Sequence, residues 1–236
     1  MMITTDLKVI DVTVDKQHIA EMPKVVFPGR IEVVQSEREM LKAIEYLRKQ
    51  PVVGLDTETR PCFSKDRSHK VSLLQVSSDN ICFLFRLNLI GLPAELISFL
   101  EEDTPIKIGI SFHDDVRMLH QRAPFEMGKW VELQKMVGLF GIADRSLQKI
   151  YANLFHQRIS KTQRLSNWEA DVLSDGQKQY AAIDAWACIR IYRELMNMRM
   201  NHNYVLATET SMLSMIDHVV VDMKTALPKK RRYRRK

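Results

Sequence analysis

A short apolar run in the first third of the chain constrains the fold more than any other feature. It reads Pro51-Val52-Val53-Gly54-Leu55-Asp56, with no polar side chain before the aspartate. Alternate side chains of a strand point to opposite faces, so a strand that is apolar at every position is buried on both. We therefore expect a central strand with structure packed on each side and acidic residues where it ends.

The patterns around this run predict alternating strands and helices. Ile31–Val34 alternates like a strand, and Ser36 and Glu39 form a capping box that begins a helix ending near Arg48. The other expected strands cover Val71–Val76 and Ile81–Phe85, which form a hairpin, and Ile106–Ile110; helices are expected over Leu92–Glu101, from Val116, and over Leu133–Leu139, Leu147–Leu154 and Gln177–Met196. No clear strand is expected after Trp130. The order indicates an α/β fold with helices on both faces of a sheet.

Length and composition fit one domain. A chain of 236 residues with 45% apolar content can bury a full core. We expect a single domain over residues 25–200, with an N-terminal extension over 1–24 and a C-terminal extension over 201–236. There is no internal repeat.

The basic character belongs to the end of the chain. The formal net charge is +6, but seven of the last eight residues, Lys229–Lys236, are Lys or Arg, and the rest of the chain has a net charge of −1. This basic tail can bind nucleic acid non-specifically, or it can be a solvated end or a nuclear address. The charge does not predict a positive surface on the folded body.

Other features argue against export and membranes. The three cysteines are odd in number and widely spaced, which predicts neither a disulfide framework nor a zinc knuckle. No apolar stretch approaches the roughly 18 residues that cross a bilayer, and the first residues do not resemble a signal peptide. We expect a cytoplasmic protein with no membrane association; the sequence indicates no oligomeric state.

The central strand ends in two carboxylates that can act together. Asp56 and Glu58 are separated by one residue, so on an extended strand they share a face and can reach one hard cation. Isolated acids at a strand end are more often solvated turn residues. Here they follow a strand too apolar for a sheet edge, and because buried unpaired charge is costly, a functional role is favoured.

Two further acidic segments follow. Asp114 and Asp115 come after the strand over 106–110, where either one alone could simply cap the next helix. In the late helix, Tyr180 and Asp184 are four residues apart and share a face with several alanines, which favours close packing against a neighbour. A Tyr and an Asp at this spacing are also common on solvated helix surfaces, so each segment is weak by itself.

Together and in this order, the segments resemble the Tyr-containing branch of the DEDD exonuclease superfamily, and within it the domains similar to ribonuclease D and the Werner syndrome helicase exonuclease. The resemblance covers about Gly29 to Leu195 and rests on Val53–Thr59, Lys107–Leu119, Tyr180–Asp184, and Lys161 with Ser166–Glu169. Asp115 is four residues before Leu119, the usual family spacing, and is preferred to Asp114.

The resemblance implies a ribonuclease H-like fold, with a mixed central β-sheet flanked by helices. It also implies 3′-5′ exonuclease activity on nucleic acid, DNA or RNA, with a free 3′ end, supported by two Mg²⁺ or Mn²⁺ ions. Hard cations of this kind prefer carboxylate oxygens. The implied metal ligands are Asp56, Glu58, Asp115 and Asp184, and Tyr180 is the fifth catalytic residue, which orients the nucleophile or passes on its proton.

The resemblance further implies that the end of the first motif, the segment Thr59–Lys70 and the following strand hold the terminal nucleotide. The candidate substrate-binding residues are Thr57, Thr59, Leu74, Gln75, Phe112 and Lys161. Phe112 can instead belong to the core, and Lys161 can be a solvated surface lysine. Trp168 is interpreted as structural, at the start of a helix.

Two rival functions remain open at the sequence level. A nucleic-acid-binding module on the same fold would have lost its chemistry, but the full set of carboxylates is present here. A small-molecule phosphatase or phosphodiesterase would use similar metal ligands without needing a 3′ terminus. Blocking the 3′ end of a substrate therefore distinguishes it from an exonuclease.

Overall fold

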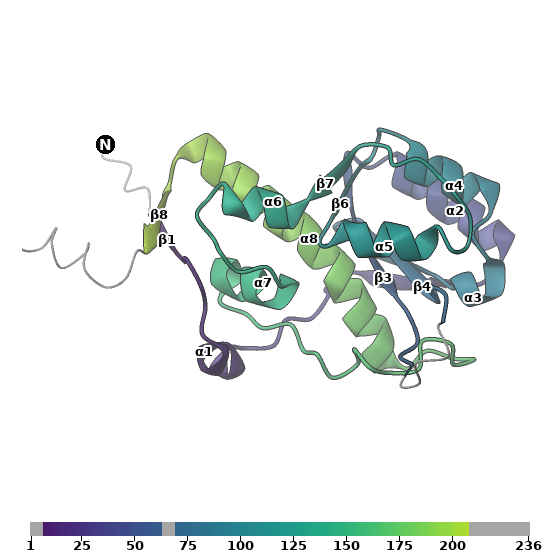
Figure 1. Ribbon diagram of the computed structural model, residues 1–236, viewed down its shortest axis with the longest axis horizontal. Helices are drawn as coiled ribbons and strands as arrows, with labels where there is room; N and C mark the ends of the chain where they lie inside the picture. The colour runs from purple at the N-terminus through teal and green to yellow at the C-terminus, as the bar shows by residue number, and fades with distance from the viewer. Residues whose placement is uncertain (1–6, 63–68, 208–236) are drawn as a thin grey trace, which may run out of the picture.

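A computed structural model describes residues 7–62 and 69–207 of the chain (Figure 1). At its centre is a mixed sheet of six strands in the order β2-β5-β4-β3-β6-β7. The strands are β2 (Arg30–Val34), β3 (Val52–Glu58), β4 (Leu73–Ser77), β5 (Ile81–Phe85), β6 (Ile106–Gly109) and β7 (Trp130–Glu132). β4 is antiparallel to both of its neighbours, and the other pairs are parallel. The apolar run is β3, an interior strand as predicted.

Helices cover both faces of the sheet, which confirms the predicted α/β class. One face carries α6 (Leu133–Gly138), α7 (Leu147–Phe155) and α8 (Asp175–Asn201), and the other carries α2 (Glu37–Arg48), α3 (Leu87–Ile90), α4 (Ala94–Glu101) and α5 (Phe112–Leu119). Each face has its own apolar core. Along β3, Val52 packs into the first core, whereas Val53 and Leu55 pack into the second. Because successive side chains of β3 pack into different cores, the strand needs an uninterrupted apolar run.

The two ends of the described chain meet at one side of the molecule. β1 (Lys8–Asp11) pairs in parallel with β8 (Tyr204–Ala207), and the short helix α1 (Lys16–Glu21) follows β1 (Figure 1). Ile10 is fully buried in the first core, and Ile19 of α1 packs with Ala152 of α7. Residues 8–24, expected as an extension, are therefore packed against the helical layer that includes α7.

Three local predictions were wrong. β7 is a strand after Trp130, where none was expected, and its three residues are too few to show a period. α5 begins at Phe112, one turn before Val116, because the turn that precedes it is stabilised by a residue distant in sequence. The stretch Ser166–Glu169 forms turns, and the next helix begins only at Asp175.

Two predicted features lie outside the described residues: the basic tail over 229–236 and the middle of the segment between Thr59 and Lys70. In the part of the chain that the structure describes, no helix is both long enough and apolar enough to span a membrane.

Candidate metal centre

Two acidic residues of β3 and one of α8 form a cluster where β3 ends. Asp56 and Glu58 lie on the same face of the strand, and Asp184 approaches them from α8. One carboxylate oxygen of each lies within 4.8 Å of those of the other two. This approach depends on Gly54, because a Cβ at that position would lie 1.8 Å from the carbonyl oxygen of Ala185. The absence of a side chain at Gly54 lets α8 pack directly on the backbone of β3.

Asp115 reaches the same end of the sheet from the opposite helical layer. It lies in the first turn of α5 and accepts a hydrogen bond of 2.5 Å from the Thr57 hydroxyl. Its charge contributes to raising the pKa of Asp56. Asp114 instead faces solvent, with its side chain 71% exposed and 3.3 Å from Arg117. Of the two adjacent acids, Asp115 is the one directed towards the cluster.

Glu132 holds the first turn of α5 in place, and sequence reasoning missed it. Its carboxylate accepts hydrogen bonds from the backbone N–H groups of Ser111 (3.1 Å), Phe112 (2.9 Å) and Gln134 (3.0 Å). Ser111 has a φ of 61°, in the left-handed region that residues other than glycine rarely adopt. The bonds to Glu132 therefore stabilise an unfavourable turn that places Asp115. Glu132 is the last residue of β7, so its role could be predicted from the sequence only if that strand were recognised first.

Tyr180 lies one helical turn before Asp184, and its hydroxyl interacts with the Asp184 carboxylate. Burial and the nearby carboxylates raise the pKa of Tyr180 above its usual value, because a phenolate would add a further negative charge. At neutral pH the hydroxyl is therefore protonated and acts as a donor. The ring of the fully buried Trp168 has its centroid 6.0 Å from that of Tyr180 and supports it from the core.

The carboxyl groups of the site all have raised pKa values. Burial, with help from neighbouring carboxylates, raises the pKa of Glu58 to about 9 and that of Asp56 well above its usual range. Burial also raises the pKa of Asp184 to about 7 and that of Asp115 to about 6. Carboxyl groups this close cannot all ionise without a nearby positive charge.

The donor set fits a hard divalent cation. All three grouped donors are carboxylate oxygens, with no His or Cys among them. Mg²⁺ and Mn²⁺ prefer such oxygens, whereas zinc usually recruits nitrogen or sulfur. A divalent cation would supply the positive charge that allows these clustered carboxyl groups to ionise together.

Two basic side chains lie beside the acids. Burial raises the pKa values of Asp184 and Glu58, and two nearby cations offset part of that rise. The positive charge of Lys161 favours the ionised form of Asp184, and that of Arg164 favours the ionised form of Glu58. A pocket of about 230 Å³ is lined by both cations together with Tyr180 and Asp184. Lys161 is exposed and lies at the site, as expected of a phosphate contact; Arg164 was not predicted.

Several predicted substrate contacts are not available at the surface. Leu74 and Gln75 are fully buried, and Phe112 is 4% exposed and packs edge-on against Trp130. These three side chains are therefore covered in this structure, and Phe112 belongs to the core, which was its alternative interpretation. Gln75 pairs with Asp56 in the sheet, and its amide has no hydrogen-bond partner among the described residues.

The two threonines of the first motif differ in position. Thr57 is directed towards Asp115 by their hydrogen bond, which makes it a residue that positions an acid. Thr59 follows the end of β3 and is partly exposed, so it remains accessible to a ligand. The cluster thus combines Asp56, Glu58 and Asp184 directly, with Asp115 and Tyr180 beside it.

A family model described as 3′-5′ exonuclease matches residues 31–199. The chain is 29% identical over 199 residues to a 3′-5′ exonuclease of Arabidopsis thaliana, a match that covers 75% of this chain and 67% of that protein. It is 31% identical over 176 residues to exonuclease 3′-5′ domain-containing protein 2 of Drosophila melanogaster, which covers 70% of this chain. That match covers only 30% of the Drosophila protein.

The fold is also found among solved structures. The Nibbler EXO domain of Aedes aegypti superposes with a TM-score of 0.68 at 17% sequence identity, covering 81% of this chain and 94% of that one. The identity is low, so this likeness speaks for the fold alone. The mixed sheet flanked by helices agrees with the ribonuclease H-like architecture that the sequence motifs imply.

Proposed function

Because the chain belongs to the 3′-5′ exonuclease family, we propose that it hydrolyses phosphodiester bonds at the 3′ end of nucleic acid and releases nucleoside monophosphates. One observation supports this most directly: Asp56, Glu58 and Asp184 come together from two elements into a single acidic cluster. Asp115, from the opposite helical layer, lies at the same end of the sheet. The proposed substrate is DNA or RNA with a free 3′ hydroxyl.

The proposed cofactor is a pair of Mg²⁺ or Mn²⁺ ions. In this proposal Asp56, Glu58 and Asp184 would hold the ions at the cluster, and Asp115 would contribute a further carboxylate from α5. When bound, such ions lower the pKa of water and neutralise negative charge that develops on the phosphate and the leaving oxygen. The raised pKa values of the four carboxyl groups support a need for this positive charge.

The remaining roles belong to side chains of the chain itself. Tyr180 keeps its proton at neutral pH and donates a hydrogen bond, so it orients the attacking water rather than acting as a strong base. Lys161 offers a point charge to a phosphate oxygen, which favours binding without reading the base. Thr57 holds the Asp115 carboxylate in position.

Digestion of a 5′-labelled single-stranded DNA and of its RNA equivalent, each 12 nucleotides long, tests the proposal. We expect a ladder that shortens from the 3′ end in Mg²⁺ or Mn²⁺ and is lost with EDTA and with Asp56→Ala. A substrate with a blocked 3′ end should remain intact. The preferred sugar is the one whose ladder advances faster.

Two adjacent acids provide a matched pair of variants. Asp115→Asn should lower kcat by at least about 10²-fold, because it removes a charge at the cluster. Asp114→Asn removes the same charge from a solvent-facing side chain and should leave kcat within about twofold.

Two outcomes of the digestion would contradict the proposal. If every substrate stays intact in both metals while binding is retained, the protein is a binding module. If the strand with the blocked 3′ end is cut equally well, the protein is a different phosphodiesterase.

A further inference from the structure

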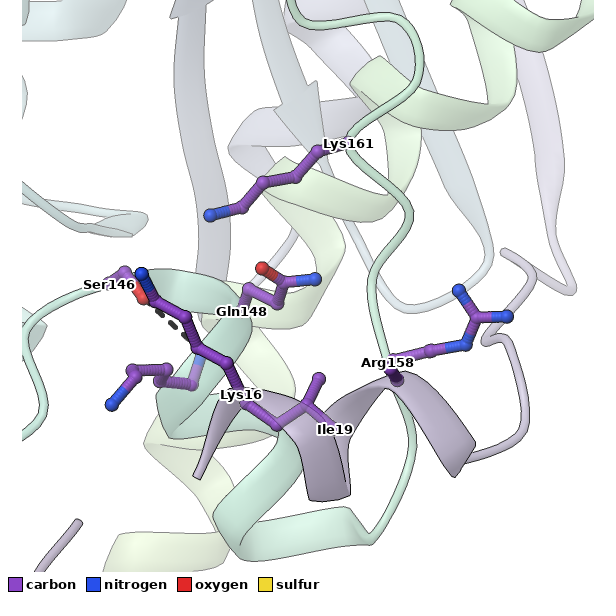
Figure 2. Close-up of a pocket in the computed structure, with 8 residues that line it drawn as sticks. Lys16, Ile19, Ser146, Gln148, Arg158 and Lys161 are labelled. Atoms are coloured by element: carbon purple, nitrogen blue, oxygen red, sulfur yellow. Dashed lines mark hydrogen bonds between the residues drawn. The ribbon is translucent and has the colours of Figure 1, made fainter. Parts of the chain in front are cut away.

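A second, basic pocket adjoins the acidic cluster on the side of α1 and α7. It has a volume of about 390 Å³ and is lined by four cationic side chains, those of Lys16, Lys149, Arg158 and Lys161. In Figure 2 the Lys16 side chain extends from α1 to Ser146, and Lys161 extends from the loop after α7 towards the same space. Among the described residues no carboxylate lines the pocket, so the charge of this lining is positive.

The cations of this pocket differ in how much charge they have available. Lys16 and Lys161 are exposed and have no ion-pair partner among the described residues. Lys149 is 2.8 Å from Asp144, which offsets part of its charge. The guanidinium of Arg158 points away from Lys16 in Figure 2, and its Nε donates to the carbonyl oxygen of Met22. Lys16 and Lys161 are therefore the two cations most available to an anion.

The segment that carries Lys16 is fixed on the rest of the molecule. The backbone N–H of Val14 donates to the buried Asp144 carboxylate at 2.8 Å. Asp11 exchanges two hydrogen bonds with the side chain of Asn153, at 2.7 and 2.9 Å. With the burial of Ile19, these contacts make α1 a firm wall of the pocket. This wall lies outside residues 31–199, which the family model matches.

The basic pocket shares part of its lining with the pocket at the acids. Ser146, Gln148 and Lys161 line both, and the second pocket also contains Tyr180 and Asp184. Lys161 thus stands at the junction, with the acids on one side and Lys16 on the other. A flexible anionic chain bound at the acids can pass Lys161 and reach α1 along a path lined by positive charge.

We propose that this pocket binds backbone phosphates of the substrate strand on the 5′ side of the bond being cut, with Lys16 and Lys161 as the principal contacts. The inference rests on the proposed function. When a 3′-terminal nucleotide is removed, the phosphate at the acids is its only one, because its other end is a hydroxyl. Phosphates further from the acids can only come from the part of the strand that remains. The lining residues that the structure describes include no aromatic side chain, so we expect binding that is independent of base identity.

The test compares substrate lengths in two charge-reversal variants. The substrates are a 12-nucleotide strand and a dinucleotide whose scissile phosphate is its only phosphate. Lys16→Glu reverses a charge in the pocket; Lys42→Glu makes the same change at an exposed position of α2, on the other helical layer. The ratio of kcat/KM for the 12-mer to that for the dinucleotide is measured in wild type and both variants, with thermal unfolding as a check on folding.

We expect Lys16→Glu to lower this ratio about tenfold, mainly through KM, and Lys42→Glu to leave it unchanged. Lys16→Gln should reduce the slope of log KM against log salt concentration for the 12-mer by about 1. Equal ratios in Lys16→Glu and wild type overturn the inference while leaving the proposed function standing. If wild type cleaves neither substrate, the proposed function itself has failed. If Lys16→Glu weakens binding of inorganic phosphate but not of the 12-mer, the pocket takes a free anion and the inference is again overturned.

Discussion

At the scale of single residues, Tyr180 offers the clearest test of how the site works. Its hydroxyl interacts with the Asp184 carboxylate and stays protonated, so Tyr180→Phe removes one donor and keeps the ring. We expect kcat to fall about 10²-fold, the range typical of a lost proton-handling or orienting group. The interaction with Tyr180 offsets part of the rise in the pKa of Asp184 that burial causes, so the acidic limb of the pH-rate profile should move to higher pH in the variant.

Tyr192→Phe is the matched control for this experiment. Tyr192 lies on the same helix, is half-buried, and is not among the groups that shift the pKa values of the acids. Its removal should change neither kcat nor the pH profile. A Tyr180→Phe enzyme with wild-type kcat across the pH range would show that the phenol has no part in catalysis.

The acids could be predicted from sequence more readily than the residues that support them. Asp56 and Glu58 follow from strand geometry, and the i, i+4 spacing of Tyr180 and Asp184 predicts the contact that the structure contains. Leu74 and Gln75 were chosen by their place in a motif, which does not reveal that both are fully buried. Arg164 follows no periodic pattern, because it lies in a turn whose position depends on the whole fold.

At the scale of elements, the contact between β3 and α8 determines the geometry of the cluster. Gly54→Ala would place a Cβ 1.8 Å from the Ala185 carbonyl oxygen, which is backbone and cannot rotate away. We expect a loss of about 3 kcal/mol in the free energy of unfolding, measured with urea, as α8 is forced outward. Activity of the folded fraction should fall as well, because Asp184 moves with the helix.

Gly138→Ala is the control at this scale. A Cβ at Gly138 would meet nothing within 4 Å, and the residue is the last of α6. The substitution should be neutral or stabilising by up to about 1 kcal/mol, because alanine has the higher helix propensity. Equal stability of the two variants would mean that the close approach of α8 is not required.

Elements with a regular spacing of apolar residues were predicted from the sequence. Elements that depend on contacts with residues distant in the sequence were not. The capping box of Ser36 and Glu39 begins α2 as expected, with both of its hydrogen bonds present. β7 is a short strand that depends on its pairing with β6, and the first turn of α5 depends on the carboxylate of Glu132. Neither partner is adjacent in sequence, so local patterns could not reveal them.

At the scale of the whole molecule, the clustered acids predict how the free energy of unfolding depends on pH without metal. The folded-state pKa values of Asp115, Asp184 and Glu58, about 6, 7 and 9, lie above the ordinary values of 3.8 and 4.5. Between those limits the folded state binds more protons than the unfolded state. Stability must therefore fall as pH rises from about 4 to about 9, by roughly 1.4 kcal/mol per pH unit for each extra proton.

Thermal unfolding in EDTA at pH 6 and pH 8.5 measures this effect. The Tm should be lower at pH 8.5, and Asp184→Asn should reduce the difference. Added Mn²⁺ should raise the Tm more at pH 8.5 than at pH 6, since protons compete less for the carboxylates there. A Tm that rises with pH in EDTA would mean that these groups are already ionised in the folded protein.

The pairing of β1 with β8 has a consequence for how this unit can be joined to others. Because the two strands are parallel, Lys8 lies opposite Tyr204 and Asp11 lies opposite Ala207, so the first and last strands of the described chain are neighbours in one small sheet. This sheet lies beyond the C-terminal end of α8, about 25 Å along the helix from Asp184 at 1.5 Å per residue. A domain or linker joined to the chain at this sheet would therefore lie far from the acids.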